Sequence, residues 1–390
     1  MRQSDALYLD ACATSPPAAE VLAAMAAVDR DAWANPSSLH GFGLCAAESL
    51  ERSRLRLAEL LGCEGEELLF SSGGSESIHL ALLGVAAALP PGRLLISAVE
   101  HSATRAAAER LRCSGWDVQV VPVNHLGQVD AAALQLLLAP PTRLVSLIWG
   151  QSEVGTLQDL ERLGGLCRSA GVLLHVDAVQ VVGHQPVQFQ ALPVDLMSLT
   201  AHKLQGPRGI GALLVRRGLP LHPLIGGGGQ ERGRRGGTEP VALAAGMARA
   251  LELAHARLSD HDGSDPVAAL RDQLLESLLA VNGVELTGPD PRAGQARLPH
   301  HLSVLVSDRC GRPLAGRALV RALWCEGIAA SSGSACSAAG PAASAVLLAI
   351  GVPAERAGSG LRLSLGPWLE PTDLQLVAPA LERAIDHLSA

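Results

Sequence analysis

Short apolar segments alternate with longer Ala- and Leu-rich segments between residues 68 and 215. The short segments have the length and apolar character of buried strands, and the longer ones are typical of helices. The seven predicted strands are Leu68–Phe70, Leu94–Ser97, Val118–Val121, Leu144–Ile148, Leu173–Val176, Leu196–Leu199 and Ala212–Val215. This alternation predicts an α/β fold with a largely parallel sheet.

A polar segment, Leu258–Pro266, interrupts this pattern and predicts a boundary between two parts of the chain. Beyond it, His301–Val306 and Leu361–Ser364 are expected to form strands. We therefore expect a smaller α/β domain in the C-terminal part of the chain.

Composition excludes several functional classes. The formal net charge is −7 and there is no block of basic residues, which argues against a nucleic-acid partner. No apolar run approaches the roughly 20 residues that span a bilayer, and the first residues lack a signal-peptide pattern, so we expect a cytoplasmic protein with no membrane partner. Eight cysteines are scattered without a Cys-x-x-Cys pair, so no metal site is predicted.

Lys203 is the only lysine in the chain, although the chain has 31 basic residues in all. Arginine can replace lysine as a surface charge, but it cannot deprotonate near neutral pH or form an imine with a carbonyl. Lys203 follows the predicted strand Leu196–Leu199 and stands next to His202. This position favours Schiff-base chemistry, and the alternative is a solvated surface lysine.

Small and polar residues follow three other predicted strands, where parallel sheets bind ligands. A Ser- and Gly-rich turn, Ser71–Ser77, could bind a phosphate with its backbone N–H groups, although such turns also cap helices without a ligand. Glu100 and His101 follow the second strand, and the histidine could stack on a planar ligand or serve a structural role. Asp177 and Gln180 place a carboxylate at a strand end and an amide one helical turn later.

Together these residues supply what pyridoxal 5'-phosphate requires: an amine for its aldehyde, a carboxylate for its ring nitrogen and a turn for its phosphate. The carboxylate keeps the ring nitrogen protonated, so that the ring accepts the electrons released when a substrate Cα–H bond breaks. The sequence therefore predicts pyridoxal 5'-phosphate as the cofactor.

A series of motifs runs in order along essentially the whole chain. They are Tyr8–Asp10, Asn35–Gly41, Ser72–Ser77, Glu100–His101, Ser152–Thr156, His175–Gln180, His202–Lys203, Gly227–Gly233, Arg235–Thr238, Ser331–Cys336 and Leu361–Gly366. Through these motifs the sequence closely resembles the cysteine desulfurases, which are pyridoxal-phosphate enzymes of the class V aminotransferase group. Cys336 precedes Arg362 by 26 positions, which resembles the long-loop branch of that family.

The resemblance implies the fold of pyridoxal-phosphate-dependent transferases. A large cofactor-binding domain with a mainly parallel, seven-stranded sheet is expected over residues 15–258. A small α/β domain that carries the nucleophile loop is expected from residues 1–14 and 259–390.

The resemblance also implies roles at the cofactor. Lys203 would form the Schiff base, Asp177 would pair with the pyridine nitrogen, and Gln180 would face the phenolic oxygen. His101 would stack on the ring and assist proton transfer. Ser152 would also touch the cofactor, and the phosphate would be held by Gly74, Ser75, Thr200 and His202, joined by Thr238 from the second subunit of a homodimer.

At the substrate, the resemblance implies that Arg362 clamps the carboxylate of L-cysteine, with Asn35 and Ser152 beside it. Cys336 would be the nucleophile that receives the sulfur as a persulfide and passes it to an acceptor protein, an iron–sulfur scaffold or a thiolation relay. Apart from Cys336, the segment 331–345 consists of Ser, Gly, Ala and Pro, which is typical of a loop, so the thiol is expected to be reachable. The alternative is an incidental loop cysteine.

Two departures from the family pattern affect the expected activity. Gln151 and Ser152 replace paired asparagines, so the shorter Ser152 would need a water or help from Gln151 to reach the substrate. Ala11 and Cys12 stand where the family commonly has two asparagines. The departures leave two alternatives to a cysteine desulfurase: a related lyase or transaminase acting on selenocysteine or cysteine sulfinate, and a weakly active sulfur-relay or assembly scaffold.

Overall fold

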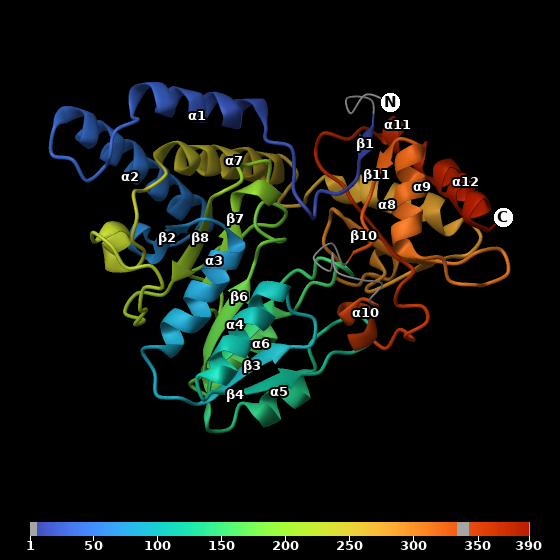
Figure 1. Cartoon of the computed structure of the whole chain (residues 1–390), viewed down its shortest axis with the longest axis horizontal. Helices are drawn as coiled ribbons and strands as arrows, with labels where there is room; N and C mark the ends of the chain where they lie inside the picture. The colour runs from blue at the N-terminus through green and yellow to red at the C-terminus, as the bar shows by residue number, and fades with distance from the viewer. Residues whose placement is uncertain (1–5, 334–342, 390) are drawn as a thin grey trace.

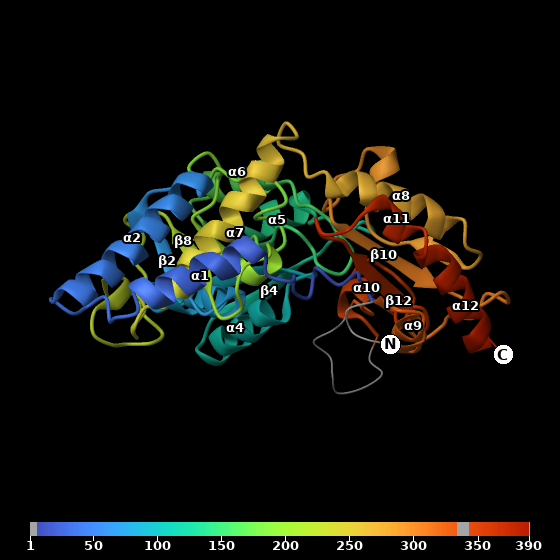
Figure 2. The ribbon, with the colours of Figure 1, turned by 90° about the horizontal axis from the view of Figure 1, so that it is seen from above.

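The computed structural model describes residues 6–333 and 343–389, which form a larger and a smaller part side by side (Figure 1, Figure 2). Cys336 lies outside the described residues. Among the described residues, no helix is both long enough and apolar enough to cross a membrane.

A seven-stranded sheet forms the centre of the larger part, in the order β2-β8-β7-β6-β5-β3-β4. Only β8 runs antiparallel to its neighbours, so the sheet is mainly parallel. The strands are β2 (Leu68–Ser71), β3 (Arg93–Ser97), β4 (Asp117–Val121), β5 (Thr142–Ile148), β6 (Leu173–Asp177), β7 (Leu196–Thr200) and β8 (Gly211–Val215). All seven predicted strands are confirmed.

Both faces of this sheet are covered, which explains why its central strands are mostly apolar and buried, whereas the edge strand β4 is partly exposed. In β7, Met197 and Leu199 pack on one face, whereas Leu196 packs on the other, as the two-residue period of a strand requires. The first face is covered by α5 (Ala131–Leu137), α6 (Leu160–Ser169) and α7 (Val241–Ser259), with α1 (Ala19–Asp31) and α2 (Gly41–Leu61) packed on α7. The second face is covered by α3 (Gly74–His79), its π-helical continuation η3 (Leu80–Gly84) and α4 (Ser102–Cys113).

The smaller part contains an antiparallel sheet in the order β12-β10-β9. Two of its strands, β10 (His301–Val306) and β12 (Gly360–Ser364), confirm the two strands predicted for the C-terminal part. The third is β9 (Val284–Leu286), and the helices are α8 (Val267–Leu279), α9 (Gly316–Cys325), α10 (Ala345–Ala349), α11 (Pro371–Leu374) and α12 (Val377–Ser389).

The first residues that the structure describes, from residue 6 on, belong with the smaller part (Figure 1). There, β1 (Leu7–Tyr8) pairs in parallel with β11 (Ile328–Ala329), and Leu9 is buried in the C-terminal hydrophobic core. That core shares no residue with the core beneath the large sheet, among the residues described. The domain limits at residues 14 and 258 stay predictions.

Residues 10–15 cross from the smaller part to the larger one, where they meet the ends of the central strands. The backbone N–H of Ala11 bonds to the carbonyl of Ser364 in β12, and that of Ser15 bonds to the carbonyl of His202 just after β7. We call residues 10–15 the crossing segment. It brings both parts of the molecule to the carboxyl ends of β6 and β7, where an α/β sheet places its ligands.

Candidate active site

Lys203 ends the short 3₁₀ helix η4 (Ala201–Lys203) that follows β7, and its side chain points at the crossing segment. Its Nζ donates to the carbonyl oxygen of Ala13 at 2.8 Å and also to that of Cys12. Burial lowers the pKa of Lys203, Arg362 lowers it further, and Asp177 is among the groups that oppose the shift. The surface-lysine alternative is therefore wrong, and this amine loses its proton more readily than an exposed lysine.

Asp177 is the last residue of β6 and its carboxylate is buried. Its Oδ1 accepts the backbone N–H of Val179 at 3.0 Å. Burial raises the pKa of Asp177, while His101 and Lys203 act against the rise. Such a buried carboxylate is suited to hold a proton on a ring nitrogen placed against it.

Glu100 is a second buried carboxyl, which sequence reasoning noted only as a neighbour of His101. Its Oε1 accepts the Ser97 hydroxyl at 2.5 Å and the Ile148 N–H at 2.8 Å. Its Oε2 is buried and has no partner among the residues that the structure describes. Burial raises the pKa of Glu100 to about 8, and the charge of Asp177 adds to the rise. At neutral pH, Glu100 is therefore mostly protonated and adds little negative charge beside Asp177.

His101 caps α4, and its Nδ1 accepts the backbone N–H of Ala103 at 3.1 Å. A neutral histidine that accepts at Nδ1 carries its hydrogen on Nε2. The ring is thus held in one tautomer, with a donor at the nitrogen turned away from the helix.

Gln180 is buried one turn beyond Asp177, as the spacing predicted. Its Nε2 donates to the carbonyl oxygen of Cys12 at 3.0 Å, and its Oε1 lies 3.3 Å from Nε2 of His300. The crossing segment therefore contacts both Lys203 and Gln180. His300, at the start of the predicted strand 301–306, was not identified from the sequence.

The turn between β2 and α3 leaves a small cradle beside Thr200. A Cβ added to Gly74 would lie 2.8 Å from Cγ2 of Val179, and one on Gly73 would lie 3.8 Å from Oγ1 of Thr200. The first N–H groups of α3, including those of Gly74 and Ser75, have no acceptor within the helix. The cradle thus combines backbone donors with a hydroxyl.

His202 borders the crossing segment, where its Nδ1 lies 3.1 Å from Oγ1 of Thr14. Burial lowers the pKa of His202 to about 4, with Lys203 and Arg208 adding to the shift. His202 is therefore neutral at neutral pH and acts as a hydrogen-bonding group rather than as a cation.

Arg362 on β12 is buried and faces the crossing segment from the smaller part. Its Nη2 donates to Oδ1 of Asp10 at 2.8 Å and its Nη1 donates to the carbonyl oxygen of Ser152 at 3.1 Å. Its Nε is buried and has no partner within the described part of the chain. Arg362 can therefore donate a further hydrogen bond to an acceptor such as a carboxylate.

The loop with Ser152 is held mainly by its own backbone and by Gln151. Oε1 of Gln151 accepts the N–H of Val154 at 2.9 Å, and its Nε2 donates to the carbonyl of Val99 at 3.1 Å. The Gln151 amide is thus occupied within the loop, so the expectation that it could stand in for the shorter Ser152 is wrong. Ser152 instead uses its carbonyl, which accepts from Arg362 and from Nε2 of His301 at 3.0 Å.

Cys12 lies in the site itself. Its backbone N–H donates to Oγ of Ser364 at 2.8 Å. Burial raises the pKa of its thiol, and Arg362 and Lys203 oppose the rise. The departure from the family pattern at this position thus places a neutral thiol between the lysine and the arginine.

Three predicted site residues are exposed: Ser75 near the start of α3, Asn35 and Thr238. Asn35 is exposed, and its Oδ1 accepts the N–H of Ser37 within a turn. Thr238 is exposed on the loop after η5 (Gln230–Gly233), and Arg235 of this loop pairs with Glu76 of α3 at 2.8 Å. The structure therefore does not bring Asn35 or Thr238 of the same chain into the buried group around Lys203.

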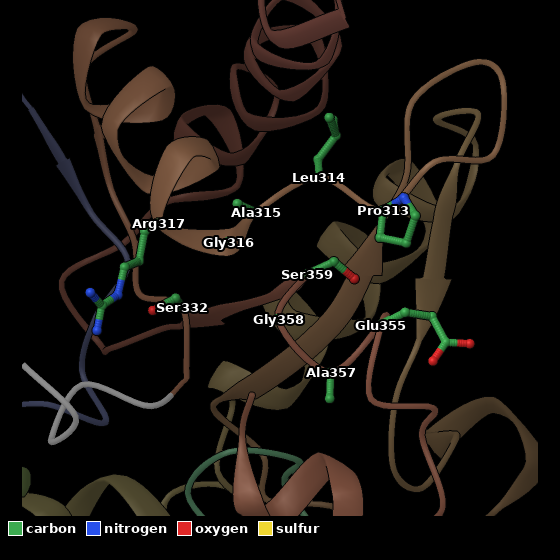
Figure 3. Close-up of a pocket in the computed structure, with 10 residues that line it drawn as sticks. All are labelled: Pro313, Leu314, Ala315, Gly316, Arg317, Ser332, Glu355, Ala357, Gly358 and Ser359. Carbon is green, nitrogen blue, oxygen red and sulfur yellow. The ribbon is translucent and has the colours of Figure 1, made fainter. Parts of the chain in front are cut away.

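The smaller part also contains a separate cavity of about 240 Å³ (Figure 3). Its lining consists of residues 313–317, Ser332, Glu355 and residues 357–359. Of the predicted site residues that the structure describes, none lines it. Within 6–333 and 343–389, no three His, Cys, Asp or Glu side chains are grouped so as to hold a metal.

The buried residues fit pyridoxal 5'-phosphate. They offer an amine with a lowered pKa at Lys203, a buried carboxylate at Asp177 and an amide donor at Gln180. The turn at Gly73 and Gly74 is suited to a phosphate, because the first N–H groups of α3 have no acceptor within the helix and a Cβ on Gly73 would meet only the Thr200 hydroxyl, at 3.8 Å.

Comparison with known proteins supports the same chemistry. The family described as Aminotransferase class-V matches residues 7–377. The chain is 36% identical to cysteine desulfurase IscS of Dictyoglomus turgidum, over 98% of this chain and 95% of that protein. It is 39% identical to cysteine desulfurase of Cereibacter sphaeroides, over 98% and 97% of the two chains.

Solved structures show the same fold. A NifS-like protein superposes with a TM-score of 0.88 at 32% identity, covering 98% of this chain and 99% of the other. The structure described as SspA in complex with cysteine superposes with a TM-score of 0.80 at 30% identity, covering 93% and 100%.

Gly155→Ala is expected to destabilise the loop that holds Ser152. Gly155 has φ +77°, and an added Cβ would lie 2.6 Å from Nδ1 of His301 and 2.8 Å from Nε of Arg297. We expect the free energy of unfolding to fall by about 2 kcal/mol in denaturant titrations. Gly165→Ala in α6 is the control, since a Cβ there meets nothing within 4 Å. Equal stabilities of the two variants would contradict the packing described for the loop.

Glu100→Gln is expected to change how stability depends on pH. The folded chain holds a proton on Glu100 up to about pH 8, whereas the unfolded chain releases it near its ordinary pKa of 4.5. Between pH 4.5 and about 8 the folded state therefore binds more protons than the unfolded state. The stability that protonated Glu100 contributes is fully present below pH 4.5 and is lost as the pH rises towards 8. In unfolding titrations, the free energy of unfolding of the wild type relative to Glu100→Gln should fall as the pH rises. Glu161→Gln, on the exposed side of α6, should show no such change relative to the wild type. Parallel profiles for wild type and Glu100→Gln would refute this assignment.

Proposed function

The chain belongs to the class-V aminotransferase family and, within it, to the cysteine desulfurases, and from this membership we propose that it converts L-cysteine to L-alanine with pyridoxal 5'-phosphate. The observation that carries the proposal is the meeting of Lys203, Asp177 and Arg362 at one junction, with the crossing segment between them. When bound, the cofactor supplies an electron sink for the electrons of the broken Cα–H bond.

Lys203 is suited to carry the cofactor and then to move the Cα proton. Its buried amine has a lowered pKa, so it can be neutral when it accepts a proton. Asp177 would keep the ring nitrogen protonated, because a carboxylate placed against that nitrogen favours its charged form. Neutral Glu100 adds no competing charge beside it.

Arg362 is suited to bind the carboxylate of the substrate. Its buried Nε has no partner among residues 6–333 and 343–389, and its two Nη atoms are already oriented by Asp10 and Ser152. A guanidinium held in this way binds a carboxylate with directional hydrogen bonds. Arg362 would thereby place the Cα–H bond of the substrate near Lys203.

Sulfur removal is assigned to Cys336, which lies outside the described residues, so this role rests on the resemblance. The thiolate of Cys336 would attack the substrate sulfur, so that an S–S bond forms while the Cβ–S bond breaks. Protonation of the carbon product completes L-alanine. The persulfide would then pass to a thiol of an acceptor protein, an iron–sulfur scaffold or a thiolation relay, and the cytoplasmic location stays a prediction.

A homodimer is also part of the proposal. Trp33, Leu39 and Phe42 are 67%, 92% and 64% exposed, and the rings of Trp33 and Phe42 lie 5.8 Å apart. We call these three residues the apolar patch; it lies where α1 leads into α2 (Figure 1). Exposed apolar clusters of this kind mark interaction surfaces. A second copy would cover the patch, and its Thr238 could reach a site that Thr238 of the same chain does not enter.

Lys203→Ala and Cys336→Ala are expected to separate cofactor binding from sulfur transfer. Both variants should release no sulfide and alanine from L-cysteine, a loss of at least a hundredfold, because one lacks the proton-moving amine and the other the nucleophile. The visible absorption of bound cofactor should disappear only in Lys203→Ala. Cys325→Ala, which removes an exposed cysteine on α9, should behave as wild type. A wild-type protein with cofactor absorption but no cysteine turnover would rule out the desulfurase function.

Trp33→Asp combined with Phe42→Asp is expected to yield monomers with weakened cofactor retention. Charges on the apolar patch oppose its burial, and a monomer lacks the Thr238 of a second subunit. Analytical ultracentrifugation should show half the wild-type mass, and dialysis should remove more cofactor. Leu136→Asp, which alters an exposed apolar residue on α5, is the matched control. A double variant with the wild-type mass would exclude the patch as the dimer contact.

A further inference from the structure

Behind Gln180 lies a buried group of polar residues to which the proposed mechanism assigns no role. His184 and His300 stack with ring centroids 3.7 Å apart and planes at 16°. Nδ1 of His184 lies 2.7 Å from Oδ2 of Asp265, and Nε2 of His300 lies 3.3 Å from Oε1 of Gln180. Asp265, His184 and His300 therefore form a continuous chain of contacts that ends at Gln180; we call these three residues the histidine relay.

The hydrogen bonds of Gln180 determine which way round its amide lies. A backbone carbonyl can only accept, so the amide end at Cys12 must be Nε2. The other end is then Oε1, an acceptor, and His300 must carry its hydrogen on Nε2. The reversed amide would set Oε1 against the Cys12 carbonyl, so that two acceptors would face each other. It would also move the hydrogen of His300 to Nδ1, which is buried without a partner among the described residues. Both contacts therefore select the same orientation.

The rest of the relay holds the His300 ring in place. Asp265 accepts the Val267 N–H at 3.1 Å and both Nε and Nη2 of Arg257 at 3.3 Å. Although burial raises it, the pKa of Asp265 is held below its usual value by the hydrogen bond and charge of His184 and by Arg257. Because the Asp265 carboxylate is fixed, its contact with Nδ1 holds the His184 ring in one plane. The His300 ring stacks on the His184 ring and is held nearly parallel to it.

The charges around His300 keep its ring neutral. Burial lowers the pKa of His300 well below its usual value, and His184, His301, Lys203 and Arg257 all act in the same direction. A protonated His300 would carry a positive charge in a buried position close to these groups. The single hydrogen on its Nε2 is thus available to Gln180 throughout the neutral range.

We propose that the histidine relay is a positioning device that orients Gln180 so that the second hydrogen of its Nε2 faces the phenolic oxygen of the cofactor. This inference rests on the proposed function, from which the place of Gln180 beside that oxygen is taken. A donor at the oxygen stabilises its negative charge most when the proton shared with the Lys203 nitrogen has left. The relay therefore sets the pH at which the visible absorption of the bound cofactor titrates.

The test is a spectral pH titration of the holoenzyme and its variants. Gln180→Leu should raise the spectral pKa by about one unit, because it removes a donor to a charged oxygen. His300→Leu should raise it by about half a unit, because it frees the Oε1 end of the amide while the Cys12 carbonyl still accepts from Nε2. His300→Gln should retain the wild-type value, since its amide can donate from nearly the same place. The double variant His300→Leu with Gln180→Leu should shift no further than Gln180→Leu alone, because both changes act through one donor.

A second variant, Asp265→Asn, acts on the same ring from further away and serves if His300→Leu does not fold, which circular dichroism would show. It should raise the spectral pKa by a few tenths, since His184 loses the charge that orients it. An unchanged spectral pKa in His300→Leu beside a raised one in Gln180→Leu would overturn the relay and leave the desulfurase function standing. Additive shifts in the double variant would also overturn it. A wild-type protein that acquires no titrating visible absorption with pyridoxal 5'-phosphate would instead overturn the proposed function, and the relay with it.

Discussion

The carbonyl oxygen of Cys12 is the contact on which the geometry of the site depends. It accepts hydrogen bonds from Nζ of Lys203 and from Nε2 of Gln180, two side chains that reach the junction from different strands. The same residue is fixed to the smaller part through its N–H, which bonds to Ser364. Any displacement of one part of the molecule against the other would therefore move the lysine and the amide together. Because the crossing segment bonds to both parts, the relative position of the two parts determines where Lys203 and Gln180 lie.

Burial is the second constraint, and it determines which groups of the site carry charge. It lowers the pKa of Lys203, lowers that of His202 to about 4 and raises that of Glu100 to about 8. These groups are thereby biased towards their neutral forms, whereas the Arg362 guanidinium keeps its charge beside Asp10. A site with few charges in a poorly solvated space strengthens each interaction that a bound ion makes there.

Sequence patterns predicted the central sheet because its strands are buried on both faces and so appear as continuous apolar segments. They also predicted Lys203 and Asp177, since each follows a strand at the edge where ligands bind. They did not reveal β1 and β11, which have two residues each and lack a periodic pattern. Nor did they identify His184, His300 or Asp265, because these residues come together only in the folded chain and their spacing carries no motif. The polar segment 258–266 was interpreted as a boundary, yet its Asp265 is buried and contacts His184.

The two departures from the family pattern fall at positions where the site uses the main chain. Ser152 contacts Arg362 and His301 through its carbonyl oxygen, and Cys12 contacts Lys203 and Gln180 through its own. Backbone atoms are retained whatever the side chain, so neither replacement removes a contact that orients the lysine, the amide or the arginine. What the replacements change is the side-chain chemistry beside Arg362, where an amide is absent at position 152 and a buried thiol is present at position 12. The departures therefore bear on how the substrate fits rather than on how the cofactor site is built.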